Sequence, residues 1–371
     1  MHRMNSTTHD HDLTERLREQ VAAARKENHG LMIRGGGSKS LLTGMGFVQG
    51  DGGAVSLEVS RHVGLVSYDP AELVLTARAG TRLSVIEALL AAHGQMLAFE
   101  PPHFGDSATL GGTVACGLSG PRRPFAGSAR DSVLGCKMIN GQAKVLSLGG
   151  RVMKNVAGFD LSRLMAGSMG ALGVLLEVSV KVVPRPEAET TLVFRLNPGD
   201  AVTAMNRWSA QPWPLSALAH EDGWTYVRLS GHESALASAK AQLGGDMAAD
   251  GPGFWYRLRE QRGRFFRYPP LGGHLWRLSI APATPPIDLP GHWLHDWGGA
   301  QRWLRSDAPA EAVFAAAAQV GGHAMLWRGP DACHGQVRQA LSPGLRTVHA
   351  RLKQALDPQG LFNPHGFRSM L

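Results

Sequence analysis

The spacing of apolar residues predicts two helices in the first third of the chain. Apolar side chains repeat at helical intervals over residues 13–21. Asp12 and Glu15 form a capping signal at the start of this helix, and Gly30 can close it. A second helix is expected at residues 84–93, closed by Gly94.

Short apolar runs between and after these helices predict strands. They lie at residues 31–33, 55–59, 73–77, 133–139, 143–148 and 174–183. Asn140-Gly141 predicts a tight hairpin turn between two of them. Hairpins and parallel-type crossovers in one chain favour an α+β fold.

The second half of the chain has a different character. All nine tryptophans lie after residue 200, and Pro184-Arg-Pro-Glu187 separates the two halves. Because prolines interrupt regular structure, we expect a domain boundary there. A length of 371 residues accommodates two or three domains.

Composition excludes several classes of protein. With 43% hydrophobic and 18% charged residues, the chain is neither disordered nor fibrous. The net charge of +8 favours anionic ligands or partners. No run of Lys and Arg resembles a nucleic-acid-binding arm, so we expect no nucleic-acid partner.

Cysteine usage and hydropathy bear on location. Cys116, Cys136 and Cys333 form neither a disulfide framework nor a zinc-binding spacing, which predicts a reducing, cytoplasmic environment. Residues 1–12 form a polar tail without the apolar core of a signal peptide. The longest strongly apolar stretch, residues 164–176, is too short to span a bilayer, so membrane association would be peripheral or through a partner.

The first chemical signal is Arg34-Gly-Gly-Gly-Ser-Lys39, directly after a predicted strand. Glycines allow backbone amides to turn toward an anion, and the hydroxyl and ammonium groups of the last two residues add polar contacts. The alternative is a flexible surface turn. The pattern matches neither the G-x-G-x-x-G nor the Walker sequence, which argues against both of those nucleotide sites.

Two further loops are rich in small residues. One runs from Glu100-Pro-Pro-His-Phe-Gly105 through Gly111-Gly112 to Cys116-Gly-Leu-Ser-Gly120. The other runs from Gly149 to Gly173 and includes Lys154-Asn155. Tight packing of two elements would also explain such loops. Three of them together predict an elongated phosphate-bearing ligand such as a dinucleotide. Cys116 fits packing better than redox chemistry.

Together these loops resemble the FAD-binding domain of the vanillyl-alcohol-oxidase family, also called the PCMH-type flavin domain. The runs at 155–160 and 167–173, and Leu356-Asp-Pro-Gln-Gly-Leu-Phe-Asn-Pro364, are similar to the family's later motifs. The resemblance implies an FAD-binding domain at 13–186, a cap domain for substrate and partner at 187–345, and a segment at 346–371 that returns to the flavin.

The resemblance also implies the FAD-binding residues. They are Arg34, Gly35, Gly36, Gly37, Ser38, Lys39, Pro102, Gly105, Ser107, Ala108, Thr109, Leu110, Gly111, Gly112, Cys116, Gly117, Ser119, Gly120, Gly158, Gly167, Ser168, Gly170, Leu172, Gly173, Val174 and Asn363. No residue resembles the histidine that some relatives link to FAD, so non-covalent binding is expected.

Within that family, the chain resembles the E-subunit family of glycolate oxidase, also called glycolate dehydrogenase. The motifs that carry this resemblance are Glu100-Pro-Pro-His-Phe-Gly105, Gly120-Pro-Arg-Arg123, Val152-Met-Lys-Asn-Val-Ala-Gly158, Leu275-Trp-Arg-Leu-Ser279, Trp297-Gly-Gly-Ala-Gln-Arg-Trp303 and Gly321-Gly-His-Ala324. After Pro364 the family usually continues Gly-Arg, whereas this chain has His365-Gly366.

The resemblance implies oxidation of a small 2-hydroxy acid, glycolate, by FAD. It also implies two partners, a homologous D-type flavoprotein subunit and an iron–sulfur F-type subunit. This chain has no cysteine set for a cluster. Relatives that oxidise D-2-hydroxy acids carry a His-rich metal motif around Gly-Asp-Gly-Asn. This chain lacks that motif, so no metal site is expected.

Oxidation of a hydroxy acid requires a cation for the carboxylate and a base for the hydroxyl proton. Arg277 and Arg328 are candidates for the cation, and Arg302 is a third. His323 is the first candidate base and His220 the second. Each has a structural alternative: Arg277 alternates on a strand like a solvated residue, and His323 follows a glycine pair like a turn residue.

Two other functions stay open from the sequence. The chain could hold FAD only as an electron relay or scaffold, with catalysis in the D subunit, and the missing metal motif favours this possibility. A nicotinamide-dependent reductase of the cell-wall-precursor type would share the fold, but no motif supports a second nucleotide site.

Overall fold

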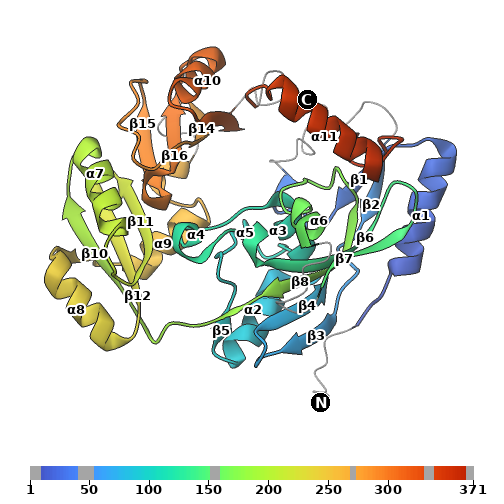
Figure 1. Cartoon of the computed structure of the whole chain (residues 1–371), viewed down its shortest axis with the longest axis horizontal. Coiled ribbons are helices and arrows are strands. Elements are labelled where there is room, and N and C mark those ends of the chain that lie inside the picture. The colour runs from blue at the N-terminus through green and yellow to red at the C-terminus, as the bar shows by residue number, and fades with distance from the viewer. Residues whose placement is uncertain (1–9, 41–53, 151–158, 268–272, 330–337, 365–371) are drawn as a thin grey trace.

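The computed structural model describes residues 10–40, 54–150, 159–267, 273–329 and 338–364. Two lobes lie side by side (Figure 1). We call residues 10–184 the N-terminal lobe and residues 188–328 the cap. The C-terminal segment, residues 343–364, packs back onto the N-terminal lobe at the upper right of Figure 1.

A five-stranded antiparallel sheet forms the centre of the N-terminal lobe. Its strands, in spatial order, are β3 (Leu65–Asp69), β4 (Val74–Arg78), β8 (Val174–Lys181), β6 (Val133–Ile139) and β7 (Val145–Gly149). The first seven residues of β8 are all buried, as its continuous apolar sequence predicts for a central strand covered on both faces.

Helices supply the rest of this core. Side chains of α1 (Thr14–Glu27), α2 (Leu83–Ala92) and α3 (Leu110–Cys116) pack into one cluster with β4, β6 and β8. The smaller elements are α4 (Arg123–Ala126), α5 (Ala129–Ser132) and α6 (Phe159–Leu164), the parallel pair β1 (Leu31–Arg34) and β2 (Val55–Glu58), and the antiparallel pair β5 (Gln95–Met96) and β9 (Val183–Pro184).

The cap is built on an eight-stranded antiparallel sheet. Its spatial order is β13 (Asp246–Met247), β10 (Ala188–Arg195), β12 (Trp224–Gly231), β11 (Leu215–Glu221), β15 (His292–Asp296), β16 (Gln301–Ser306), β14 (His274–Ser279) and β17 (His323–Arg328). Together with the N-terminal sheet, it confirms the predicted α+β class.

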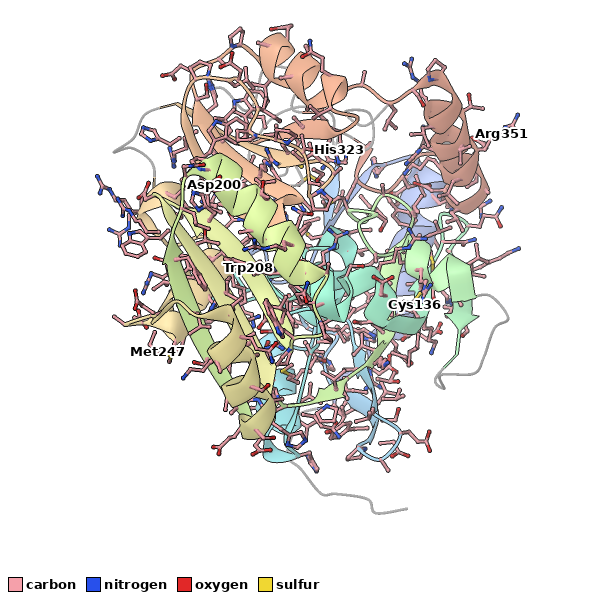
Figure 2. The ribbon with its side chains drawn as sticks, turned by 60° about the vertical axis from the view of Figure 1, so that its left-hand side comes forward. Cys136, Asp200, Trp208, Met247, His323 and Arg351 are labelled. Carbon is pink, nitrogen blue, oxygen red and sulfur yellow. The ribbon has the colours of Figure 1, made fainter. Side chains whose placement is uncertain are left out.

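Helices and turns complete the cap. They are α7 (Pro198–Ser209), α8 (Glu233–Leu243), α9 (Gly251–Arg259), α10 (Ala310–Gln319) and the 3-10 turns η2 (Arg264–Phe266) and η3 (Trp297–Gly299). Trp208 on α7 packs under the first half of the sheet, and Phe314 on α10 packs under the second half. Figure 2 labels Trp208 in the cap and Cys136 in the N-terminal lobe.

A buried ion pair anchors the C-terminal segment. Helix α11 (Pro343–Leu356) places the Lys353 ammonium 2.7 Å from the Asp357 carboxylate, and Nζ also donates to the Ala171 carbonyl at 2.6 Å. The carboxylate of Asp357 accepts the amides of Leu361 and Phe362. These contacts fold the chain back so that it lies beside β1, where Phe362 forms a parallel bridge with Leu31.

Two local expectations are wrong. Helix α1 ends at Glu27 and is closed by Asn28, which adopts φ 56°, rather than by Gly30. Asparagine tolerates this left-handed conformation because its short side chain bonds locally. The capping signal at the other end is met only in part: the carboxylate of Asp12 accepts the amide of Thr14, but Leu13 is the N-cap residue and Glu15 bonds Arg18 instead.

The hairpin after β6 also differs from its prediction. Its turn is longer than Asn140-Gly141, and Ala143 rather than Gly141 has positive φ. The Asn140 carboxamide accepts the amides of Gln142 and Lys144, which stabilises the longer turn. Gly141 is needed instead for its close approach to Asp357, whose Oδ1 lies 2.4 Å from where a Cβ would be.

We predict that Asp357→Ala strongly destabilises the protein. The substitution leaves the buried Lys353 ammonium without its counter-ion, which should lower the free energy of unfolding by about 3–5 kcal/mol. Glu15→Ala, which breaks the exposed pair with Arg18, is the control and should cost less than ~1 kcal/mol. Denaturant titration followed by circular dichroism measures both, and equal losses would contradict the assignment.

Candidate functional site

A cavity of about 550 Å³ opens where the β1 loop, α3 and the segment after α6 meet. This volume is typical of a cofactor site. Its lining residues are Ile33, Arg34, Gly35, Gly36, Gly37, Ser38, Lys39, Ser40, Val59, Ala79, Thr109, Gly111, Gly112, Ala115, Cys116, Ser168, Met169, Gly170, Gly173, Leu175 and Asn363.

Glycines are required where two segments touch behind this cavity. A Cβ on Gly36 would lie 1.5 Å from the Ser107 carbonyl oxygen, and one on Gly35 would lie 2.8 Å from Thr109 Oγ1. A Cβ on Gly111 would lie 2.6 Å from the Ala79 side chain. Any side chain at these positions would separate the loops that form the cavity wall.

The loop after β1 can accept an anion through its backbone. Among the described residues, none accepts a hydrogen bond from the amides of residues 35–39. Backbone amides that have no acceptor in the protein can bind phosphate oxygens. The described lining contains two cationic residues, Arg34 and Lys39, and no carboxylate. The donors and charges of the cavity therefore fit the pyrophosphate of a dinucleotide.

Lys39 is the buried cation of this cavity, with 6% of its surface exposed. Its Nζ donates to the His103 carbonyl at 3.2 Å and lies 5.6 Å from the centre of the Phe104 ring. Burial lowers the pKa of Lys39, opposed by the nearby Cys116 and Glu260. Burial also disfavours the charged form of Cys116 and raises the pKa of its thiol to about 11. This side chain is therefore a neutral thiol, which fits a packing role.

The C-terminal segment completes the wall through Asn363. Its Oδ1 accepts the amide of Ile33 at 2.9 Å, and its Nδ2 donates to the Met169 carbonyl at 2.6 Å. One side chain thus joins β1 to the loop that follows α6. The residue has φ 42°, so the backbone turns sharply at the contact.

The cavity gathers many of the residues expected from the sequence. Those on its lining are Arg34, Gly35, Gly36, Gly37, Ser38, Lys39, Thr109, Gly111, Gly112, Cys116, Ser168, Gly170, Gly173 and Asn363. The structure places Pro102, Gly105, Ser107, Ala108, Leu110, Gly117, Ser119, Gly120, Gly167, Leu172 and Val174 off this lining. Gly158 and His365 lie outside the described residues.

Residues off the lining have identifiable roles. Leu110 and Val174 are buried in the lobe's core, and Gly117 ends α3 at φ 64° against Gly167. Sequence reasoning missed the apolar wall residues Val59, Ala79 and Leu175. They sit on strands or directly after them, so only the strand register could have indicated which ones face the cavity.

A second, much smaller cavity of about 20 Å³ lies between the 118–121 turn and the cap sheet. This is space for roughly one water molecule. Arg277 faces it and is held by a 2.7 Å hydrogen bond from Nε to Gln301, between the rings of Trp297 and Trp327. Burial lowers the pKa of Arg277 to about 10, so the guanidinium stays charged.

Asp296 is the carboxyl group of this small cavity. Burial raises the pKa of Asp296 to about 7, despite hydrogen bonds from the Trp297 amide and Gln301. The carboxyl group is therefore partly protonated at neutral pH, and it neutralises the Arg277 charge only in part.

The other candidate catalytic residues are dispersed. Arg328 donates to Gln261 at 2.7 Å and does not line either cavity. His323 begins β17 and is exposed, below α10 in Figure 2. Desolvation by the surrounding protein, together with the Arg277 charge, lowers the pKa of His323. The structure thus brings Arg277 and His323 within electrostatic range and leaves Arg328 apart.

Arg302 and His220 are structural residues, which corrects both secondary candidates. Arg302 is fully buried and donates to the Thr284, Pro285 and Gly299 carbonyls. His220 is buried against Thr225, and burial lowers its pKa to about 4. Among the described residues, no cluster of His, Cys, Asp or Glu could hold a metal ion.

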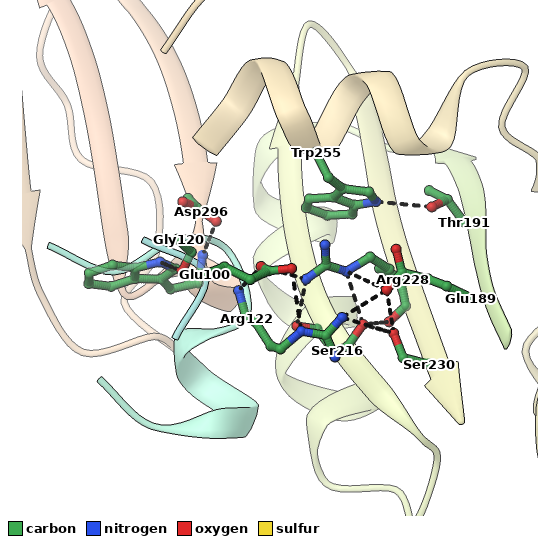
Figure 3. A network of polar contacts seen from close by, with 11 residues as sticks. Glu100, Gly120, Arg122, Glu189, Thr191, Ser216, Arg228, Ser230, Trp255 and Asp296 are labelled. Carbon is green, nitrogen blue, oxygen red and sulfur yellow. Dashed lines mark hydrogen bonds and ion pairs between the residues drawn. The ribbon is translucent and has the colours of Figure 1, made fainter. Parts of the chain in front are cut away.

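A charged network joins the two lobes beside the small cavity (Figure 3). Glu100 of the N-terminal lobe accepts from Arg228 of the cap at 2.8 Å and from the Arg122 amide at 3.0 Å. Arg122 in turn donates to Glu189 of the cap at 2.8 Å. Burial alone would raise the pKa of Glu100, but Arg228 and Arg122 lower it below its ordinary value.

Comparison with known proteins identifies the class of the cavity. A family model described as the FAD binding domain matches residues 12–149. The whole fold is similar to alkyldihydroxyacetonephosphate synthase, with a TM-score of 0.65, 16% identity and coverage of 94% of this chain and 74% of that chain. The protein is therefore a flavoprotein with a PCMH-type fold and FAD as its cofactor, as predicted.

Sequence comparison narrows the class further. The chain is 47% identical over 357 residues to glycolate oxidase subunit GlcE of Escherichia coli (strain K12), covering 95% of this chain and 97% of the relative. It is 32% identical over 130 residues to glycolate oxidase subunit GlcD of Bacillus subtilis (strain 168), covering 35% of this chain and 27% of the relative. The chain belongs to the GlcE family of glycolate oxidase subunits, within the FAD-dependent oxidoreductases.

We predict that Gly36→Ala abolishes FAD binding. The added methyl group would collide with the Ser107 carbonyl and push the two loops apart. The ratio of flavin absorbance to protein after purification should fall at least tenfold. Gly344→Ala is the control, because a Cβ there meets no atom within 4 Å. Full FAD content in Gly36→Ala would show that the loops adjust.

We also predict that Asp296→Asn changes how stability depends on pH. In the folded state the pKa of Asp296 is raised to about 7, whereas in the unfolded state it has its ordinary value near 3.8. Between these two pH values the folded state therefore keeps a proton that the unfolded state has lost. This group therefore destabilises the wild-type fold progressively as pH rises from about 4 to 7. The melting temperature of the variant relative to wild type should rise between pH 5 and pH 8. A constant difference would contradict the raised pKa.

Proposed function

We propose that this chain is the FAD-holding subunit of a glycolate oxidase complex and oxidises glycolate to glyoxylate. The observation that carries the proposal is the FAD cavity with Lys39 on its lining, together with the charged Arg277 of the cap, which acts electrostatically on His323. A small carboxylate is the ligand that such a charge distribution favours.

The reaction divides between the cofactor and the chain. FAD, when bound, supplies the acceptor for the hydride that leaves the substrate carbon bearing the hydroxyl group. The hydroxyl proton leaves to a base, for which we propose His323, and a C=O bond forms as the C–H bond breaks. The lowered pKa of His323 keeps its imidazole neutral near pH 7, as a base requires.

The two electrons must then leave the chain. We propose that they pass to an iron–sulfur F-type partner, and that a D-type flavoprotein subunit completes the complex. The relatives named GlcE and GlcD support this assembly. No helix among the described residues is long and apolar enough to cross a membrane. We propose a cytoplasmic location, with any membrane contact made through the partners.

One observation favours a second function, an electron-relay or scaffold subunit without its own turnover. Arg277 and Arg328 are each held by a protein side chain, and the cavity that Arg277 faces has space for about one water molecule. In this case oxidation of the hydroxy acid would occur in the D-type subunit.

Anaerobic reduction separates these functions. The purified chain with FAD bound should lose its oxidised-flavin absorbance when glycolate is added. His323→Gln should slow this reduction by roughly 10²- to 10⁴-fold, whereas the exposed His292→Gln should not slow it. The rate of flavin reduction should rise with pH as His323 loses its proton. Because the pKa of His323 is lowered, the rate should reach its maximum before pH 7 and stay constant above it. If the flavin bleaches only after the D-type subunit is added, the relay function holds instead.

A further inference from the structure

Arg338 is a cation that the sequence did not single out, and its backbone position is well defined. It forms an antiparallel bridge with Met325 of the edge strand β17. The next residue, Gln339, accepts the Ala324 amide at 3.2 Å and donates its own amide to the Ala324 carbonyl. Met325 packs against the cluster that contains Cys116, a lining residue of the FAD cavity, so Arg338 lies behind this wall and not on the lining itself.

The guanidinium group of Arg338 lacks a partner within the described parts of the chain. No carboxylate, carbonyl or aromatic ring among those residues pairs with it, although the side chain is partly buried. Burial lowers its pKa, and the only opposing influence is the thiol of Cys116. Nearly every other buried arginine described here has a hydrogen-bond partner. A desolvated cation without a counter-ion is unfavourable until an anion binds.

Other charged groups near Arg338 add to the excess of positive charge. Lys39 and Arg338 both act on the Cys116 thiol, and Arg338 also lowers the pKa of Arg277. The carboxylate of Glu260 acts electrostatically on Lys39, but it accepts hydrogen bonds from the amides of His103 and Phe104 and from Nε of Arg259. Lys39 on the cavity lining and Arg338 behind it thus both act on Cys116, and the carboxylate that acts on Lys39 is already bonded.

Arg338 acts on the Cys116 end of α3, whereas the glycines of the amide cradle that fits the pyrophosphate meet the other end of this helix. The cradle touches Thr109 at the N-terminus of α3, because a Cβ on Gly35 would lie 2.8 Å from Thr109 Oγ1. Cys116 is the last of the seven residues of this helix. At 1.5 Å per residue, the two ends lie about 10 Å apart. A phosphate held by the cradle therefore does not account for Arg338.

We propose that Arg338 binds the carboxylate of the small 2-hydroxy acid, with Lys39 and Arg277 adding positive charge around it. The planar guanidinium can pair both carboxylate oxygens, which orients the hydroxyl-bearing carbon. This inference rests on the proposed function, since it names the residue that anchors the substrate. Arg277, fixed between two tryptophans, acts as a positioning residue rather than as the principal ligand.

The test uses the full chain with FAD bound, and oxalate as a dicarboxylate probe that cannot be oxidised in this way. Titration followed by the visible flavin spectrum gives its Kd. Arg338→Gln should raise the Kd for oxalate and the KM for glycolate by roughly 10- to 100-fold while FAD content stays unchanged. Arg338→Lys should recover part of the affinity, since it keeps the charge without the fork.

Arg264→Gln, an exposed arginine on η2, is the matched control and should bind oxalate like wild type. An unchanged Kd in Arg338→Gln would overturn the inference, as would a loss of FAD in Arg338→Gln and Arg338→Lys alike. A wild-type chain that binds oxalate through Arg338 but is never reduced by glycolate would leave the anion site standing and refute the proposed turnover.

Discussion

The arrangement of the two lobes depends on one buried carboxylate, Glu100, which lies between Arg122 and Arg228. It comes from the N-terminal lobe, while Arg228 comes from the cap, so their 2.8 Å contact fixes one lobe against the other. Removing a partner would leave a charge inside the interface, which is far less favourable than breaking an exposed pair. The backbone of Glu100 has φ 45°, so the turn itself is shaped to bring this side chain into place.

The contacts beside the small cavity depend on that placement. The Trp297 indole donates to the Gly120 carbonyl at 3.0 Å across the same interface, and its ring lies against Arg277. The position of Arg277 is therefore set by contacts of both lobes. Because these contacts hold the cap in place, Arg277 keeps a fixed position on the small cavity, together with Asp296.

The sequence predicted the parts of the site that depend on backbone shape. Gly35, Gly36 and Gly111 had to be glycine because two backbones meet there, and a run of small residues shows that requirement in the sequence. The long buried strand β8 was equally visible as a continuous apolar run. Family resemblance then supplied the cofactor, and the comparisons confirm it.

The remaining features depend on tertiary structure and could not be read in advance. Arg277, Arg302 and Arg328 look alike in the sequence, yet one is held between tryptophans, one is buried among carbonyls and one pairs with Gln261. Arg338 carries no motif at all. Only the register of its bridge with Met325 shows that it lies near the cluster that contains Cys116. Side-chain partners decide the role of a charged residue, and partners come from distant segments.

The same dependence on distant segments explains why the site needs the whole chain. Asn363, near the C-terminus, joins Ile33 to Met169, and Lys353 bonds the Ala171 carbonyl on the loop that follows α6. The cavity wall therefore closes only after the chain has crossed into the cap and returned. This return joins the C-terminal segment to two of the segments that line the FAD cavity. A cofactor that binds in this cavity therefore stabilises the docked C-terminal segment, since it binds only the folded arrangement.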